Sequence, residues 1–510
     1  MILSILVLIQ WSLALATLVW HYRVDGKFSS LARWLVCVVP IAVALGALGY
    51  CLLVDRTRFD TGMAWPLTRL VSVLIAGNGV LLAISRSALR IERLNEMIDL
   101  KTLLVLAFGL SGVLVACLVH ANNTALNQLT ELRMEAKFLA FEVSMPRVAA
   151  ESNAALLYES CFEVTDSDTK KQRKKLFDAL SHGNLDCTSP EVIEYLKRRL
   201  PVVEKTLQAS SLTYCFFERD WSRPGGEATG RPDDMADLGK ELVLFAHCEV
   251  DSGRWHIAIP YLLAARRLAN HMRQDPPLLF LAFAAEVDNF ACEELERWLN
   301  TSVLNAGALG ELQVGWTTNS QKTYIQRSMR FELASGLGLL SSDTPSDSHW
   351  KTLLYRVFLQ SHDIVVYRRT QEAYQLAIAN LASSGTDELD ALDAVPSYQR
   401  PWMAQQLLPD YGSALKFIYK SDTRCRLVWI GIMTKRFRLK YDKLPGSAAE
   451  LCSQMNIVLP QDPLSNAPFQ MTVDGESVYW SSVGKKLAHT GDTIHNDQPS
   501  DDEGLMVRIE

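Results

Sequence analysis

The first quarter of the chain contains four long apolar segments, and the remaining residues contain no comparable one. Neither Asp, Glu, Lys nor Arg occurs within Met1–Trp20, Trp34–Val54, Leu70–Ser85 or Thr102–Val119. A helix needs about 20 predominantly apolar residues to cross roughly 30 Å of hydrocarbon. In lipid the backbone must also satisfy its own hydrogen bonds, so a segment that crosses is helical. The pattern therefore predicts a four-helix transmembrane anchor over residues 1–121, with the lipid bilayer as its surroundings.

The basic residues between these segments predict how the anchor is oriented. Two loops are rich in Lys and Arg, the first with Arg23, Lys27 and Arg33 and the third with Arg86, Arg90, Arg93 and Lys101. The second loop holds only Arg56 and Arg58. Because cytoplasmic loops carry the excess of basic residues, the first and third loops are expected on the cytoplasmic side. This predicts a multi-pass protein of the cytoplasmic (inner) membrane whose large C-terminal part lies on the exoplasmic, periplasmic side.

Residues 122–422 have mainly the apolar spacing of helices and predict a helical exoplasmic domain. A run from Asp233 to Val250, a turn at Asp251-Ser252-Gly253 and a run from Trp255 to Met272 predict a helical hairpin. Its alternation of small and large side chains is similar to that of a tetratricopeptide repeat, in which small residues let two helices approach. Further helices are expected over Pro276–Asn300, Gln321–Leu340, Trp350–Ala382 and Trp402–Tyr419, and charged loops over Asp166–Lys175 and Ser222–Asp234.

One such hairpin does not make a repeat array, because stable arrays need several stacked units. We therefore expect an irregular helical domain with tetratricopeptide-like hairpins. Grooves between helices more often bind partners than carry out chemistry, and aromatic side chains are frequent anchors in them. The candidate anchors for a protein partner are Trp255, Tyr261 and Trp298.

The last part of the chain, residues 423–510, combines helical and strand-like patterns and predicts a small α+β domain. The Asp474-Gly475 dipeptide lies between two alternating segments and is a strong signal for a β-hairpin. In chain order, the expected features are a helix over Arg424–Lys440, a Leu444-Pro445 turn, a helix over Ala448–Met455, the sequence Asp462-Pro463-Leu464-Ser465-Asn466-Ala467-Pro468, and strands over Phe469–Val473 and Ser477–Val483.

This order of features resembles the globular domain of the major pseudopilin of type II secretion. It is even more similar to the module at the end of uncharacterised planctomycete-type multi-pass membrane proteins, in which a helical middle domain often precedes it. The resemblance covers the C-terminal module, is looser over the helical middle and is absent over the apolar segments. No prepilin leader with its cleavage site and fifth-position glutamate occurs, so the module is expected to be a reused domain rather than a pilus subunit.

The resemblance also implies a metal. In pseudopilins the acidic loop after the hairpin binds calcium, which would place a calcium site among Asp492, Asp497, Asp501 and Asp502. Calcium takes about six to eight oxygen ligands, which carboxylates and backbone carbonyls can supply. The chain departs from the family because Lys485–His489 lengthen the loop and the glycine-rich turns are largely missing. The alternative is a solvated acidic tail that holds no ion.

Composition adds two constraints. The net charge is −6 and no stripe of Lys and Arg occurs, which argues against a nucleic-acid partner. The ten cysteines include no Cys-x-x-Cys pair, and the seven that follow the apolar segments are far apart. We expect most of these seven to be buried thiols, with one disulfide at most, for which Cys161 and Cys187 are the candidates.

Two motifs could carry chemistry, and each has a plainer interpretation. Gly109-Leu110-Ser111-Gly112 is similar to the Gly-x-Ser-Gly of rhomboid proteases, but the histidine nearby, His120, is on the same predicted helix about 13 Å away. His247-Cys248-Glu249 and His256 offer metal-ligand side chains. Neighbouring residues on a helix point about 100° apart, however, and His256 lies beyond the turn. Both motifs are therefore expected to be ordinary helix positions.

Four carboxylates lie on one predicted helix: Asp288, Glu293, Glu294 and Glu296. Paired carboxylates can act in acid–base catalysis, but Arg297 beside them favours an exposed charged face. No phosphate-binding loop, dinucleotide fingerprint or nucleophile elbow occurs in the sequence. The balance of features favours a protein that is not an enzyme.

The sequence thus predicts a membrane α-helical protein with four transmembrane helices, a mainly α soluble region and a small C-terminal α+β pseudopilin-like domain. Its predicted function is that of a membrane-anchored scaffold or partner-binding protein of the cell envelope, linked to a secretion-like assembly. Two alternatives stay open. One is a membrane-associated hydrolase of unknown substrate, and the other is an envelope sensor that responds to calcium or another ligand.

Overall fold

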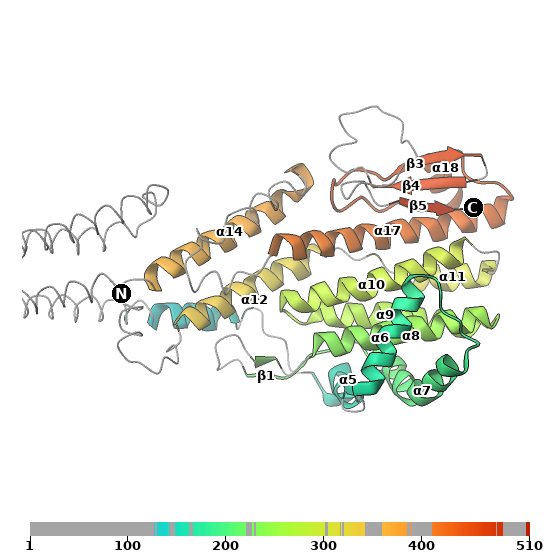
Figure 1. Cartoon of the computed structure of the whole chain (residues 1–510). Helices are drawn as coiled ribbons and strands as arrows, with labels where there is room; N and C mark the ends of the chain where they lie inside the picture. Colours follow the sequence, from blue (N-terminus) through green and yellow to red (C-terminus); the bar gives the residue numbers. More distant parts are fainter. Residues whose placement is uncertain are drawn as a thin grey trace, which may run out of the picture. The chain divides into compact units, whose positions relative to one another are not determined.

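A computed structural model describes residues 127, 130–140, 142, 148–162, 167–220, 227–228, 231–300, 304–316, 318, 321–341, 360–384, 389, 411–475, 477–482 and 506–509. Most of these residues are helical (Figure 1). The chain divides into two compact units, one made of Met1–Glu131 with Asp343–Val365 and the other of Leu132–Ser342 with Val366–Glu510. Almost all of the described elements belong to the second unit.

The structure corrects the predicted fold class and location. Among the residues that it describes, no helix combines the length and the apolar character needed to cross a membrane. The reason is clear in helix α10 (Leu278–Leu299), in which Glu286, Asp288 and Glu293 interrupt the apolar run. Charged residues near the centre of a membrane-spanning helix are costly and rare. The four apolar segments that suggested a multi-pass inner-membrane protein, within residues 1–121, lie outside the described residues.

The described helices directly before the predicted hairpin include α5 (Ala154–Phe162), α6 (Ser167–Ser181) and α7 (Pro190–Ser210). The prediction of a charged loop over Asp166–Lys175 was wrong, because α6 covers nearly all of it. Leu176, Phe177 and Leu180 at the end of this helix are buried, whereas most of the charged residues before them are exposed. The apolar residues thus anchor α6 to the core, and the charged run forms its solvent face.

The predicted helical hairpin is confirmed by α8 (Pro232–Asp251) and α9 (Trp255–Gln274). Gly253 in the turn between them has a φ of +75°, a backbone conformation that glycine adopts without steric cost. Helix α10 packs against both members of the hairpin (Figure 1). Its close approach to α8 depends on Gly239, where an added Cβ would lie 2.7 Å from Cγ1 of Val287. A small residue therefore permits this contact between α8 and α10, at a position that the sequence analysis did not single out.

The described residues after α10 form helices α11 (Ala306–Gly315), α12 (Lys322–Ser341), α14 (Gln360–Ser384) and α17 (Tyr411–Tyr441). Two helices were predicted over Trp402–Tyr419 and Arg424–Lys440, and from Tyr411, where the described residues resume, the chain forms one continuous helix, α17. The polar residues between them are paired rather than helix-breaking. Thr423 Oγ1 donates to the backbone carbonyl one turn earlier (3.0 Å), and Arg426 pairs with Asp422 at 2.9 Å. The predicted domain boundary before Thr423 falls inside this helix.

The C-terminal module contains α18 (Ala448–Met455), β3 (Gln470–Asp474), β4 (Ser477–Ser481) and β5 (Met506–Ile509). A separate short pair, β1 (Arg219–Asp220) and β2 (Glu227–Ala228), precedes α8. The three strands of the module form an antiparallel sheet in the order β3-β4-β5. Trp480 on β4 is buried, and its Nε1 donates to Thr434 Oγ1 of α17 at 3.0 Å. This bond fixes the sheet on the long helix. The hairpin and α18 were predicted, whereas β5 was not.

Asp462 is a buried carboxylate that organises the loop before the sheet. Its side chain has no solvent exposure and accepts hydrogen bonds from the backbone N–H of Leu464 (3.0 Å) and the hydroxyl of Ser465 (2.8 Å). It also accepts from the hydroxyl of Ser482 after β4 (2.6 Å) and from that of Thr423 on α17 (3.3 Å). One carboxylate therefore joins the loop, the sheet and the helix, which gives the Asp-Pro-x-x-Asn sequence a structural role.

Replacing Asp462 by Ala is expected to lower the free energy of unfolding by about 2 kcal/mol, because several buried donors lose their acceptor. Urea unfolding of the full-length protein measures this change. The exposed Asp178 of α6 offers a matched control, and Asp178→Ala is expected to change stability by less than about 0.5 kcal/mol. Equal losses in the two variants would show that Asp462 does not organise the module.

Candidate functional site

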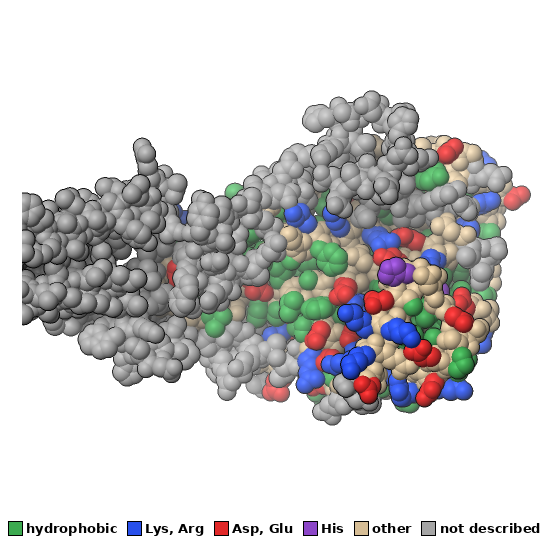
Figure 2. All heavy atoms as spheres, viewed as in Figure 1, with side chains coloured by type: hydrophobic (Ala, Val, Ile, Leu, Met, Phe, Trp, Pro, Cys, Tyr) green, Lys and Arg blue, Asp and Glu red, His purple; other side chains and the backbone are tan. Residues whose placement is uncertain are grey.

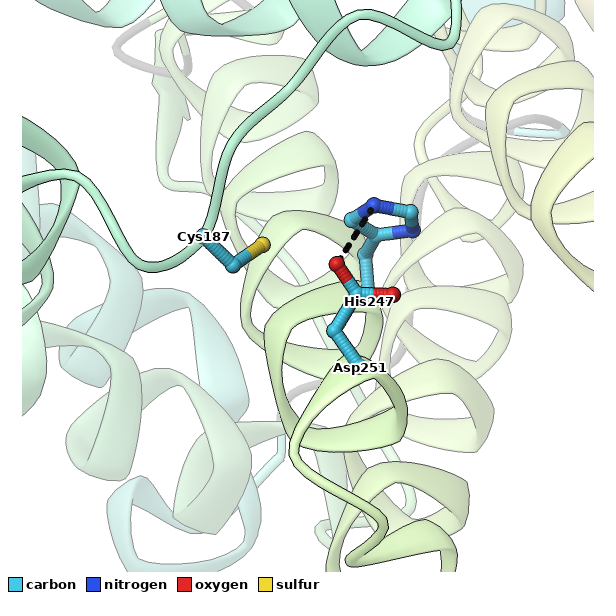
Figure 3. A group of neighbouring side chains, drawn as sticks. All are labelled: Cys187, His247 and Asp251. Carbon is cyan, nitrogen blue, oxygen red and sulfur yellow. Dashed lines mark ion pairs between the residues drawn. The ribbon is translucent and has the colours of Figure 1, made fainter.

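Three side chains of metal-ligand type meet at the end of α8: Cys187, His247 and Asp251. The Cys187 sulfur, a ring nitrogen of His247 and a carboxylate oxygen of Asp251 lie within 4.8 Å of one another. Figure 3 shows them pointing toward one another, Cys187 from a loop and the other two from a helix. His247 and Asp251 are one turn apart on α8 and so share a face. Cys187 belongs to the loop between α6 and α7.

A disulfide holds that loop against α8. Cys187 is bonded to Cys248, with their Cα atoms 5.4 Å apart. The predicted pairing of Cys161 with Cys187 was therefore wrong, because Cys161 is a buried thiol on α5. The expectation of mostly free thiols is confirmed for the described cysteines, since the free ones are Cys161, Cys215, Cys292, Cys425 and Cys452.

Hydrogen bonds from α10 orient the ring of His247. Glu294 Oε1 accepts from His247 Nδ1 at 2.8 Å and from Trp298 Nε1 at 2.6 Å. The other oxygen of Glu294 accepts from Arg297 at 2.7 Å. Glu294 is only 1% exposed, so these donors hold its carboxylate firmly. With Nδ1 fixed in this way, His247 Nε2 faces Asp251 Oδ2 at 3.7 Å.

The electrostatics of the cluster favour a positive charge at His247. Burial by itself lowers the pKa of the imidazole, but the hydrogen bond to Glu294 and the charges of Glu294 and Asp251 outweigh burial and raise it. Because Nδ1 donates its proton to Glu294, Nε2 is the atom that takes up a second proton or a metal ion. The side chain of Asp251 is 48% exposed, so this side of the cluster is open to solvent.

The sequence analysis considered His247, Cys248, Glu249 and His256 as metal ligands. In the structure only His247 of these belongs to the cluster. Cys248 is taken up by the disulfide, and Glu249 pairs with Arg254 at 2.5 Å. His256 is exposed on α9, next to the ring of Trp255. Glu249 and His256 thus lie at ordinary helix positions, whereas Cys248 forms a disulfide that the sequence analysis did not assign to it.

Three residues around His247 were missed in the sequence: Cys187, Asp251 and Glu294. The spacing of His247 and Asp251 is a visible signal, because residues four apart on a helix face the same way. Glu294 was noted only as part of a charged face. No sequence signal connects Cys187 to His247, since they meet only when the loop before α7 folds onto α8.

The carboxylates of α10 do not form the exposed charged face that the sequence suggested. Asp288 has no exposure and Glu294 only 1%; Arg273 of α9 supplies a counter-charge to Asp288, and Arg297 of α10 itself supplies one to Glu294. Glu293 and Glu296 are partly exposed and pair with Arg424 of α17 at 2.9 and 2.8 Å. These carboxylates hold helices together rather than sharing one reaction site.

Of the three predicted partner anchors, two lie at the surface. Trp255 and Tyr261 are half-buried near the start of α9. Trp298 is only 2% exposed and donates to Glu294, so it is a core residue. The predicted calcium ligands Asp492, Asp497, Asp501 and Asp502 lie outside the described residues, as does the motif Gly109–Gly112.

Comparison of the chain with protein-family models, with curated proteins and with solved structures finds no match. Its function is therefore inferred from the geometry and chemistry of its own residues.

Proposed function

We propose that the chain is a non-catalytic scaffold that binds a protein partner through the start of α9. The position of Trp255 and Tyr261 carries this proposal, because both rings pack on the helical core and are only partly buried. Tyr261 lies against Phe245 with ring centroids 5.8 Å apart, and Ile257 between the two anchors is 37% exposed. Aromatic side chains that are already positioned in this way lose little freedom on binding and often dominate an interface.

The charges around these rings indicate the chemistry of the partner. Burial raises the pKa of the Tyr261 phenol, and the nearby charges of Glu249 and Glu204 raise it further. Glu249 is paired with Arg254, whereas Glu204 is exposed, and an apolar patch beside an exposed carboxylate favours a partner segment that carries apolar side chains next to Lys or Arg.

The buried charged groups of the described core favour a scaffold over a hydrolase. Glu241 on α8 has no exposure, accepts from Tyr195 at 2.5 Å and pairs with Arg199 of α7 at 2.8 Å. Groups paired in this way fix helix positions and are not free to exchange protons with a substrate. On the face seen in Figure 2, basic and acidic side chains are intermingled, which favours a protein partner over a nucleic acid.

The C-terminal module supports one further expectation about the partner. Helices α17 and α18 and the β3–β4 hairpin follow the order of features that resembles the major pseudopilin. A secretion-like assembly is therefore the first place to look for the partner. The test of the docking surface on α9 does not depend on whether the partner belongs to such an assembly.

The test is a partner capture followed by a quantitative titration. The full-length protein is used to isolate bound proteins, and the partner identified by mass spectrometry is purified and titrated by calorimetry. Trp255→Ala is expected to weaken binding by about 30-fold or more, the effect of removing a central aromatic anchor.

Tyr214→Ala is the matched control, because Tyr214 is an aromatic residue with 43% exposure whose neighbours in the chain contact the opposite, C-terminal end of α9. This variant is expected to bind the partner with unchanged affinity. If Trp255→Ala and Tyr214→Ala bind the purified partner equally well, the start of α9 is not the docking surface.

A further inference from the structure

The cluster around His247 has a property that partner binding does not use. Because His247 Nδ1 donates to Glu294, its Nε2 presents a lone pair toward the carboxylate of Asp251, 3.7 Å away. Two acceptors that face each other repel unless a cation lies between them. In the disulfide-bonded protein a proton on Nε2 can serve as this cation. Cys187 sulfur lies beside both groups, but a disulfide sulfur is a poor metal ligand.

We propose that reduction of the Cys187–Cys248 disulfide converts this cluster into a zinc-binding site. The ligands are the thiolate of Cys187, Nε2 of His247 and a carboxylate oxygen of Asp251. The metal replaces the proton on His247 as the cation that Asp251 faces. This site is separate from the docking surface on α9, and its proof or failure leaves the proposed function untouched.

The distances suit a single metal ion. Ligand atoms about 2.0–2.3 Å from a tetrahedral zinc lie about 3.5 Å from one another. The three ligand atoms lie within 4.8 Å of one another, and the His247–Asp251 pair is already at 3.7 Å. Small side-chain rotations close the remaining gap once Cys187 is released from Cys248. The side chain of Asp251 is 48% exposed, so an ion reaches the site directly from solvent.

The ligand set selects the metal. One sulfur, one imidazole nitrogen and one carboxylate oxygen suit zinc, whereas calcium and magnesium prefer oxygen ligands alone. Three protein ligands also leave the fourth position of a tetrahedral zinc for a water molecule. The cluster therefore has the composition of an open zinc site rather than of an alkaline-earth site.

Glu294 acts as a positioning residue for His247. A metal-bound histidine usually donates its other ring N–H to a carboxylate, which fixes the tautomer and makes the ligand nitrogen more basic. Glu294 already has this relation to His247, and Trp298 and Arg297 hold its carboxylate in place. The orienting partner of the site is thus built into the core before any metal binds.

The chemistry of site formation balances with a dithiol as the reductant. The dithiol supplies two electrons and two protons, the Cys187–Cys248 S–S bond breaks, two thiols form, and the reductant closes to its own disulfide. Zinc then displaces the proton of the Cys187 thiol, which passes to solvent. His247 must also be neutral at Nε2 to bind. Zinc affinity is therefore expected to rise with pH until both groups have lost their protons.

The experiment compares oxidised and reduced full-length protein with zinc and cobalt as probes. A phosphine reduces the disulfide and is itself converted to the phosphine oxide, with oxygen from water, before the excess is removed without air. Reduced protein is expected to bind one equivalent of Co²⁺ with a sulfur-to-cobalt charge-transfer absorption, which Zn²⁺ then abolishes. Oxidised protein is expected to show no such absorption.

Three variants assign the ligands. Cys187→Ser is expected to abolish the charge-transfer absorption, and Asp251→Asn, which alters a half-exposed side chain, to weaken zinc binding by about 100-fold. Glu294→Gln is expected to keep the absorption but to weaken binding by about 10–100-fold, the usual effect of losing an orienting partner. The controls are Cys452→Ser and His256→Gln, a half-buried thiol and an exposed imidazole outside the cluster, which are expected to bind as wild type does.

Two results would overturn the zinc site. One is reduced wild-type protein that shows no charge-transfer absorption with cobalt. The other is a Cys187→Ser or Asp251→Asn variant that binds zinc as tightly as the Cys452→Ser control. Retained affinity in Glu294→Gln alone would remove the positioning role of Glu294 and keep the three ligands.

Discussion

Asp288→Asn is expected to lower the free energy of unfolding by about 3–5 kcal/mol, because it leaves two buried guanidinium groups without their counter-charge. Asp288 on α10 has no solvent exposure and pairs with both Arg266 and Arg273 of α9. Each arginine is itself only 4% exposed. The asparagine keeps the shape of the side chain but not its charge, so the loss is electrostatic rather than steric. Urea unfolding of the full-length protein measures it.

Glu286→Gln is the matched control on the same helix. Glu286 pairs with Lys240 but is 41% exposed, so this change is expected to cost less than about 1 kcal/mol. Adding Arg273→Met to Asp288→Asn is expected to restore part of the lost stability, since one unpaired buried charge is removed with the carboxylate. A loss in Asp288→Asn no larger than that in Glu286→Gln would show that the buried pairs do not hold α9 on α10.

Those parts of the fold that depend on local signals were predicted well from the sequence. Helix α18 begins and ends where the pattern places it, because Ser447 accepts from the backbone N–H of Glu450 (3.1 Å) and Asn456 ends the helix in the left-handed conformation. The α8–α9 hairpin is set in the same way by Gly253 in its turn. These signals lie within a few residues of the structure that they produce.

The failures come from contacts between distant parts of the chain. The charged run at the start of α6 was assigned to a loop because its own residues give no apolar face, and three apolar residues beyond it hold the helix. Thr423 would disfavour a helix by itself, but its hydroxyl is satisfied by the Tyr419 carbonyl one turn earlier and by the distant, buried Asp462, and α17 continues through it. Tertiary structure overrides local preference at both places.

In the candidate site, too, the contacts within one helix could be predicted from the sequence and the contacts between distant residues could not. His247 and Asp251 share a helix face that the sequence reveals, whereas Cys187 reaches them only through the path of a loop. Glu294 was assigned to a solvent face because the sequence gives no sign that Trp298 and Arg297 satisfy its carboxylate in the core. A buried charge cannot be recognised until its partners are known.

The protein is expected to lose about 3 kcal/mol of stability through His271 alone as the pH falls from 7 to 4. Burial lowers the pKa of this imidazole to about 4, from an ordinary value of 6.5; the hydrogen bond to Leu212 partly opposes this shift, and the charge of Arg267 adds a smaller lowering. The neutral ring is fully bonded, since Nε2–H donates to the Leu212 carbonyl at 2.9 Å and Nδ1 accepts from the Tyr158 hydroxyl at 3.0 Å. Protonation of Nδ1 would remove the lone pair that accepts the hydrogen bond from Tyr158.

The direction of this pH dependence follows from the lowered pKa of His271 in the folded state. Above pH 6.5 the ring is neutral in both states, so its contribution to stability is fully present there. Below that value the unfolded chain binds a proton that the folded chain refuses, and the contribution is lost as the pH falls toward 4. His271→Gln, which cannot take up a proton, is expected to be less stable than wild type at pH 7 but to lose less stability on acidification. Urea unfolding of both proteins at each pH isolates this difference, since their other titrating groups are shared. Parallel stability curves for the two proteins between pH 7 and 4 would mean that His271 is not the buried neutral group that its hydrogen bonds to Tyr158 and Leu212 indicate.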